Sequence, residues 1–182
     1  MKKRILTLVA ALFLTTSMFA QFEVKVNPIG LLFGGISASG EYILSDNMGV
    51  EVSANLLSRK ASFLAEDAKL TGFGFGAAYK YYFSPEDGGD KFYANVYARY
   101  GGQKSKFDDG AGQQITANYS VVAVGFGVGY KWVADSGLLF ELGLGAGRNL
   151  AQNWTLSDGT DNYDFPNWGF DLTGKLAIGW RF

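Results

Sequence analysis

The sequence of 182 residues contains no cysteine and no histidine, and only three prolines. Without cysteine the chain forms no disulfide bond and offers no thiol for the attachment of a lipid. Cysteine and histidine are also the usual ligands of transition metals, and histidine is the usual general base of hydrolytic active sites. These absences predict a protein that is not an enzyme, holds no metal and uses no cofactor.

Long hydrophobic runs are equally scarce. The main one is the ten-residue stretch Ile5–Leu14. A helix that crosses a bilayer needs roughly 20 apolar residues, so this run is too short to span a membrane. It follows three cations, Lys2, Lys3 and Arg4, and precedes the short segment TTSMFA. This order is typical of a secretory signal peptide. We expect a signal peptide at residues 1–20 and one exported domain at residues 21–182.

The expected exported domain has no excess of positive charge. Beyond residue 20 there are 13 lysines and arginines against 17 aspartates and glutamates, a formal charge of about −4. This balance gives no indication of nucleic-acid binding.

A two-residue alternation of apolar and polar side chains recurs through the rest of the chain. Such a period predicts a β-strand with two different faces. In the C-terminal stretch, Leu176, Ile178 and Trp180 alternate with Lys175 and Arg181. The pattern predicts eight strands, at residues 22–29, 36–44, 50–56, 71–83, 92–100, 120–133, 138–145 and 168–182. Pro28 fits near the end of the first, where its missing N–H does least harm.

The connections between these strands also alternate in length. Short connections are expected at residues 45–48, 84–90 and 134–137, and long loops at 58–69, 101–118 and 149–167, with a tight first turn at 33–35. Short turns at one end and long loops at the other are typical of outer-membrane barrels. The sequence therefore predicts an all-β, eight-stranded antiparallel up-and-down transmembrane β-barrel.

The composition of the two faces bears on the surroundings of this barrel. One face of each strand carries glycine, alanine and a few charges of both signs, a poor exterior in water but a suitable crowded interior. The other face carries large aromatic residues near the strand ends, as in the girdles of membrane barrels. A lysine at the lipid midplane costs roughly 2 to 4 kcal/mol, so we expect mid-strand Lys175 to point inward. A soluble, lipocalin-like ligand binder with its apolar face inside is the alternative.

These features together resemble the small outer-membrane barrels of Gram-negative bacteria, the OmpA, OmpX and opacity type. The resemblance is carried by the signal peptide, the eight amphipathic strands and the aromatic-x-aromatic ending Trp180-Arg181-Phe182. The stretch VNPIGLLFGGISASGEYIL also resembles the opening of uncharacterised small-barrel families. The resemblance implies an outer-membrane location, and it implies that Trp180 and Phe182 form a signal for the barrel-assembly machinery.

Eight strands enclose a space that side chains can fill, so a wide pore is not expected. Charged residues that point into it must pair, because a buried unpaired charge is costly. We predict an ion-pair network in the lumen formed by Lys25, Glu41, Glu51, Lys80, Arg99, Lys131, Glu141, Asp171 and Lys175. Glu23 and Arg181 are expected to point inward at the short-turn end, and Arg148 near the long loops.

The long loops carry whatever binding specificity the protein has. An external loop with Asp158, Asp161 and Asp164 is acidic, but its spacing lacks the full calcium-loop pattern. We expect a monomer that contacts outer-membrane lipid and lipopolysaccharide and serves membrane integrity or adhesion to an extracellular ligand or host surface. A narrow channel or carrier for a small solute is the alternative role.

Overall fold

The computed structural model describes residues 21–32, 34–60, 69–108, 114–157, 162–164 and 169–182. The strands are β1 (Phe22–Val26), β2 (Gly35–Ser45), β3 (Met48–Lys60), β4 (Lys69–Tyr82), β5 (Lys91–Asp108), β6 (Gln114–Val133), β7 (Leu138–Ser157), β8 (Asn162–Asp164) and β9 (Phe170–Arg181), with one short helix, α2 (Pro28–Leu32). The expected signal peptide, residues 1–20, lies outside the described residues.

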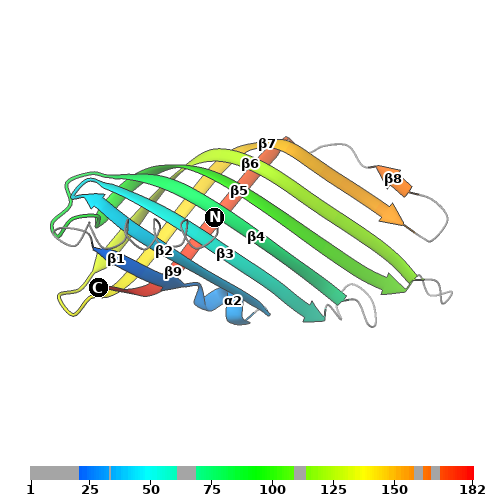
Figure 1. Ribbon diagram of the computed structural model, residues 1–182, viewed down its shortest axis with the longest axis horizontal. Helices are drawn as coiled ribbons and strands as arrows, with labels where there is room; N and C mark the ends of the chain where they lie inside the picture. Colours follow the sequence, from blue (N-terminus) through cyan, green and yellow to red (C-terminus); the bar gives the residue numbers. More distant parts are fainter. Residues whose placement is uncertain (1–20, 33, 61–68, 109–113, 158–161, 165–168) are drawn as a thin grey trace, which may run out of the picture.

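Eight of these strands form a closed antiparallel ring (Figure 1). Each strand from β1 to β7 pairs with the next, and β9 closes the ring between β7 and β1. The remaining strand, β8, pairs only with the end of β7. The predicted all-β, eight-stranded antiparallel barrel is therefore confirmed as a fold.

The side chains divide between the two faces of the ring as the alternation predicts. Large apolar residues are exposed on the outside, where Phe126 and Leu144 keep 74% and 73% of their surface. Charged residues are buried on the inside, where Glu41 and Glu141 keep none. The polar face of each strand is thus the face turned to the lumen. Within the described ranges, no helix is both long and apolar enough to cross a membrane.

The first strand is shorter than predicted. β1 ends at Val26, and Pro28 begins helix α2 instead of extending the strand to Ile29. The Asn27 Oδ1 atom accepts hydrogen bonds from the backbone N–H groups of Ile29 and Gly30 at 3.0 and 3.1 Å. Asparagine before the first turn and proline at the first helical position are both favourable, since proline lacks an N–H that the helix would leave unpaired.

Two of the predicted long loops, 101–118 and 149–167, are largely wrong, because the strands continue into them. Most of the third, 58–69, lies outside the described residues. β5 runs to Asp108, β6 starts at Gln114 and β7 runs to Ser157, so most of 101–118 and 149–157 is paired sheet. These extensions carry the segments GGQKSKFD and AQNWTLS. Both faces of the extensions are largely polar, so the sequence there has no apolar face to reveal a strand. In Figure 1 the three strands extend beyond the others toward β8.

Candidate functional site

Charged side chains from seven strands of the ring, β1 to β4, β6, β7 and β9, meet in the half of the lumen nearest the short turns. β1 supplies Lys25, β2 supplies Glu41, β3 supplies Glu51, β4 supplies Lys80 and β7 supplies Glu141. β6 adds Lys131. Each residue lies on the inward face of its strand, so closing the ring brings residues up to 116 positions apart into contact.

Two lysines hold three glutamates together at the centre of this cluster. The Nζ atom of Lys80 lies 2.7 Å from Glu41, 2.8 Å from Glu51 and 2.7 Å from Glu141. Lys25 contacts the same three carboxylates, with distances of 2.5 Å to Glu51 and 2.8 Å to Glu141. An ammonium group has three N–H donors, so each lysine can use all of them here.

Three more cations surround this centre. Lys175 from β9 contacts Glu51 and lies 2.9 Å from Glu141. Lys131 bonds Glu23 at 2.7 Å, and Arg181 donates to Glu23 through Nε and Nη2 at 2.9 and 2.6 Å. The cluster therefore contains the cations Lys25, Lys80, Lys131, Lys175 and Arg181 and the anions Glu23, Glu41, Glu51 and Glu141. Its formal charge is one positive.

Two buried tyrosines complete the cluster. The Tyr93 hydroxyl donates to Glu141 at 2.6 Å, and the Tyr82 hydroxyl donates to Glu41. Their rings also accept lysines, with Lys80 4.7 Å from the centroid of Tyr93 and Lys131 4.6 Å from that of Tyr82. Such cation–π contacts add to the ion pairs. Tyr82 was not among the residues predicted for the ion-pair network, although the alternation of β4 places it on the inward face.

Glycines on β6 and β7 leave the space that the tyrosines occupy. A Cβ atom at Gly129 would overlap the ring of Tyr93 and the carbonyl oxygen of Leu142, and one at Gly125 would overlap the Tyr97 hydroxyl. The phenol rings of Tyr93 and Tyr97 thus lie against the glycine backbone of β6 and β7. Their hydroxyl groups reach acceptors on β7 and β9. These are inward glycines of strands, which accounts for the glycine-rich strings of the sequence.

The turn between β4 and β5, residues 84–90, covers the short-turn end of the lumen. Arg181 donates from its guanidinium to the carbonyl oxygens of Asp87 and Gly89, both at 3.1 Å. Gly89 donates its N–H to the carbonyl of Asp46 at 2.6 Å and packs against the buried Ile43. Gly88 and Gly89 have φ angles of +71° and +57°, a conformation in which glycine is favoured. The sequence predicted only a short connection here, without a covering role.

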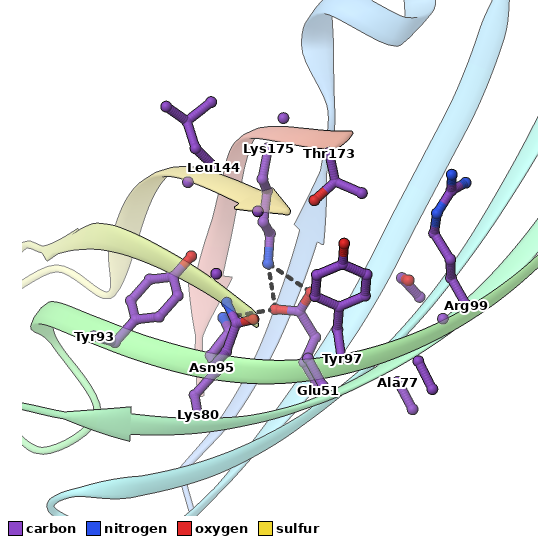
Figure 2. Close-up of a pocket in the computed structure, with 18 residues that line it drawn as sticks. Glu51, Ala77, Lys80, Tyr93, Asn95, Tyr97, Arg99, Leu144, Thr173 and Lys175 are labelled. Atoms are coloured by element: carbon purple, nitrogen blue, oxygen red, sulfur yellow. Dashed lines mark hydrogen bonds and ion pairs between the residues drawn. The ribbon is translucent and has the colours of Figure 1, made fainter. Parts of the chain in front are cut away.

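The other half of the lumen is more open (Figure 2). Cavities of about 160 and 230 Å³ lie above the cluster and share Ser53, Gly76 and Arg99 in their walls. Arg99 forms a bidentate ion pair with Asp171, and the Tyr97 hydroxyl donates to the same carboxylate at 2.7 Å. In Figure 2, Lys175 points from β9 toward Glu51 at the floor of the first cavity.

The structure thus separates the nine residues predicted for the lumen into two groups. Seven lie in the cluster at the short-turn end: Lys25, Glu41, Glu51, Lys80, Lys131, Glu141 and Lys175. Arg99 and Asp171 form a separate pair. This pair lies nearer the long hairpins, the end of the barrel where β5, β6 and β7 extend beyond the other strands (Figure 1). Glu23 and Arg181, also expected to point inward, join the cluster.

Arg148 is the one expected inward residue that points the other way. It follows Leu142 and Leu144 in the two-residue period of β7 and is exposed on the outside of the ring, opposite Val124 and Phe170. The expectation of an inward Arg148 was wrong, and the alternation itself indicates the outward position.

The residues of the predicted assembly signal lie at the end of the last strand. Trp180 is half exposed on the outer face, and Phe182 is 74% exposed while its N–H donates to the carbonyl of Phe22 at 2.9 Å. In the predicted acidic loop, Asp158 and Asp161 lie outside the described residues. Asp164 is the last residue of β8, and only its backbone is described.

The three central glutamates could in principle hold a cation, because oxygens of Glu41, Glu51 and Glu141 all lie within 4.8 Å of one another. The ammonium groups of Lys25 and Lys80 already contact all three carboxylates. A metal ion there would have to displace both buried lysines, so the cluster is better suited to pairing its own charges than to binding a metal.

The sequence model of a family described as "Protein of unknown function (DUF3575)" matches residues 5–172. The chain belongs to the DUF3575 family. No curated protein matches it. Among solved structures, the DUF3575 barrel is similar to the crystal structure of a major outer membrane protein from Thermus thermophilus. The TM-score is 0.57 at 13% sequence identity, over 90% of this chain and 100% of the other. At this identity the similarity concerns the fold alone.

Proposed function

We propose that this DUF3575 protein spans the bacterial outer membrane as a sealed barrel, with the short turns in the periplasm and the long hairpins outside the cell. The observation that carries the proposal is the sidedness of the ring. Apolar residues such as Phe126 and Leu144 are exposed outside, while Glu41, Lys80 and Glu141 are buried inside. A barrel in water would have to hydrate the first group and bury the second, which is unfavourable in both respects.

The length of the apolar band supports a membrane location. Along β4 and at Phe83, the residue after its end, the outward residues from Phe73 onward are aromatic or small. Ten residues at about 3.3 Å each, tilted by about 40°, cover roughly 25 Å along the barrel axis, the height of the apolar band of outer-membrane barrels. A lipocalin-like role would instead need an apolar interior, and the lumen here holds an ion-pair cluster.

Within the membrane, we propose a structural or surface-interaction role. The cluster and the turn 84–90 close the periplasmic half of the lumen, so the polar hairpin extensions of β5, β6 and β7 are the parts available to partners outside the cell. Adhesion and membrane integrity are the roles that this arrangement favours. We propose no catalytic role, because Glu41, Glu51 and Glu141 are each held by at least two lysines and none is free to act as a general base.

A narrow channel or carrier is the second candidate, favoured by the cavities of about 160 and 230 Å³ in the outer half of the lumen. Conductance in planar bilayers separates the two candidates. We expect no steady single-channel current from the refolded barrel. A steady current that disappears when Lys175 and Arg99, which line the cavities, are replaced by Trp would favour the channel and contradict the seal.

The membrane location has its own test. Outer-membrane fractions are expected to hold the protein, which should migrate faster on SDS gels before heating than after. Recovery in the periplasm or the medium without detergent would contradict the proposal.

A further inference from the structure

The paired strands β4 and β5 present an ordered series of side chains on the outer surface near the long hairpins. Reading along the strands away from the short turns, the outward pairs are Phe75 with Tyr100, Phe73 with Gly102, Thr71 with Lys104, and Lys69 with Lys106. Aromatic residues thus give way to lysines within three steps of the sheet. Each step advances by two residues, about 7 Å.

The aromatic part of this series forms one packed group. The ring of Phe73 lies 6.1 Å from that of Phe75 and 5.8 Å from that of Tyr100, between centroids. All three rings are exposed on the outer surface. Aromatic side chains at this level of a membrane barrel mark the boundary between acyl chains and headgroups. The lysines therefore lie roughly 7 to 14 Å beyond that boundary along the strand, at the depth of the lipid headgroups.

The three lysines, Lys69, Lys104 and Lys106, are called here the lysine patch. All three are exposed. Lys69 and Lys106 are direct cross-strand partners, which places their Cβ atoms about 5 Å apart, and like charges in this position repel. Lys60 continues the row in register, since its Cα is the partner of that of Lys69 on β3.

The patch has no acidic partner in the part of the chain that the structure describes. The carboxylates found within 4 Å of a lysine or arginine there belong to other sites: the lumen cluster, the pair of Arg99 with Asp171, and the pair of Lys91 with Glu86. These adjacent ammonium groups lie beyond the aromatic residues along the strands. They are placed to bind an anionic group in the surface of the membrane. Each lysine near an anionic surface contributes about 1 kcal/mol to binding.

We propose that the lysine patch binds the phosphate groups of lipid A, the anionic lipid part of lipopolysaccharide in the outer leaflet. The inference rests on the proposed membrane location, which places the long hairpins and the patch outside the cell. The fatty acyl chains of the lipid lie against Phe73, Phe75 and Tyr100, and its phosphates contact Lys69, Lys104 and Lys106. A nucleic acid or an acidic peptide would use the lysines but would gain nothing from the apolar surface beneath them.

The proposal is tested by titrating the detergent-solubilised barrel with lipid A and counting bound lipids by native mass spectrometry. Replacing Lys69, Lys104 or Lys106 by Gln is expected to weaken binding roughly fivefold for each residue, and on the order of a hundredfold for all three. A variant with Arg at all three positions keeps the charge and should bind as the unchanged protein does. Raised ionic strength should weaken binding to the unchanged protein.

Two controls keep the result interpretable. Lys91→Gln removes one half-exposed cation, paired with Glu86 at the short-turn end, and should leave lipid A binding unchanged. Inorganic phosphate at the same phosphorus concentration should not compete, since it lacks acyl chains. Equal lipid A binding by the triple Gln variant would overturn the lysine patch as the site. Effective competition by inorganic phosphate would overturn the lipid as the occupant.

The gel shift on heating distinguishes failure of this inference from failure of the proposed function. If the triple Gln variant folds into vesicles, shows the shift and still binds lipid A, only the lysine patch is refuted. If the unchanged protein neither enters vesicles nor shows the shift, the membrane location itself fails.

Discussion

At the scale of single residues, Glu141 links most of the lumen cluster. Its carboxylate contacts Lys25, Lys80 and Lys175 and accepts a hydrogen bond from Tyr93, with no exposed surface. Burying charges costs free energy that only close pairing offsets, and removing one partner leaves the others uncompensated. The cluster is therefore stable only while its anions are present.

Replacing Glu141 by Gln tests this coupling. The change keeps the volume but raises the formal charge of the cluster from one to two positive, so we expect unfolding to become easier by about 3 kcal/mol. Urea unfolding in lipid vesicles, followed by the gel shift on heating, measures the change. Glu86→Gln, in the exposed pair with Lys91, is the control and should have no measurable effect. Equal effects of the two substitutions would contradict the role given to the cluster.

The inward glycines of β6 and β7 allow a second test at the scale of single residues. Gly129→Ala forces the new methyl group against the Tyr93 ring and the Leu142 carbonyl, so we expect a loss of about 1 to 3 kcal/mol. Gly101→Ala is the matched control, because its Cβ would meet only the Phe73 carbonyl oxygen at 3.6 Å and a methyl carbon of Val121 at 3.8 Å. The same urea titration compares them. If Gly101→Ala were the more damaging change, the packing account would be wrong.

At the scale of the elements, the last strand closes the ring and carries the proposed assembly signal. β9 pairs with both β7 and β1, and Phe182 continues this pairing through its N–H to Phe22. The side chain of Phe182 is exposed, so its removal should cost little packing within the barrel.

Phe182→Ala is therefore expected to reduce assembly more than stability. In cells, the amount of heat-modifiable barrel in the outer membrane should fall severalfold, while barrel refolded in vitro should unfold at nearly the same urea concentration. Phe170→Ala, at the other end of the same strand and 73% exposed, is the matched control and should assemble normally. Equal assembly of both variants would contradict the assembly role of Phe182.

The sequence predicted those elements whose two faces differ and missed those whose faces do not. Residues 71–83 and 120–133 alternate apolar with small or charged residues, and both segments lie almost wholly within strands. The extensions of β5 to Asp108 and of β7 to Ser157 were missed, because a strand with water on both sides needs no apolar face. Helix α2 was missed because one turn capped by Asn27 is too short to show a helical period.

The candidate site follows the same logic. Alternation along each strand predicts which charges point inward, because a charge on the lipid face is costly. It does not predict which anion meets which cation, because that depends on the register between strands, such as Lys131 opposite Glu141. The covering turn at residues 84–90 depends on contacts from Arg181 and Asp46 that no local pattern reveals.

At the scale of the whole molecule, the barrel is closed in the half nearest the short turns and hollow in the half nearest the long strand extensions. The cluster, Tyr82, Tyr93 and the turn 84–90 fill the first half, and cavities lie in the second. On one side of the barrel, β5, β6 and β7 extend beyond the other strands (Figure 1). Under the proposed orientation, this asymmetry would place the surface available to partners on one side of the barrel opening.

The central claim, that apolar residues face acyl chains and charged residues face the lumen, is tested most directly by site-specific quenching. The chain has no cysteine, so single cysteines at Phe126, Leu144, Ser53 and Asn95 can each carry a fluorophore in vesicles of brominated lipid. The account predicts strong quenching at Phe126 and Leu144, which point outward, and weak quenching at Ser53 and Asn95, which line the cavities. Strong quenching at Ser53 and Asn95 with none at Phe126 and Leu144 would contradict it.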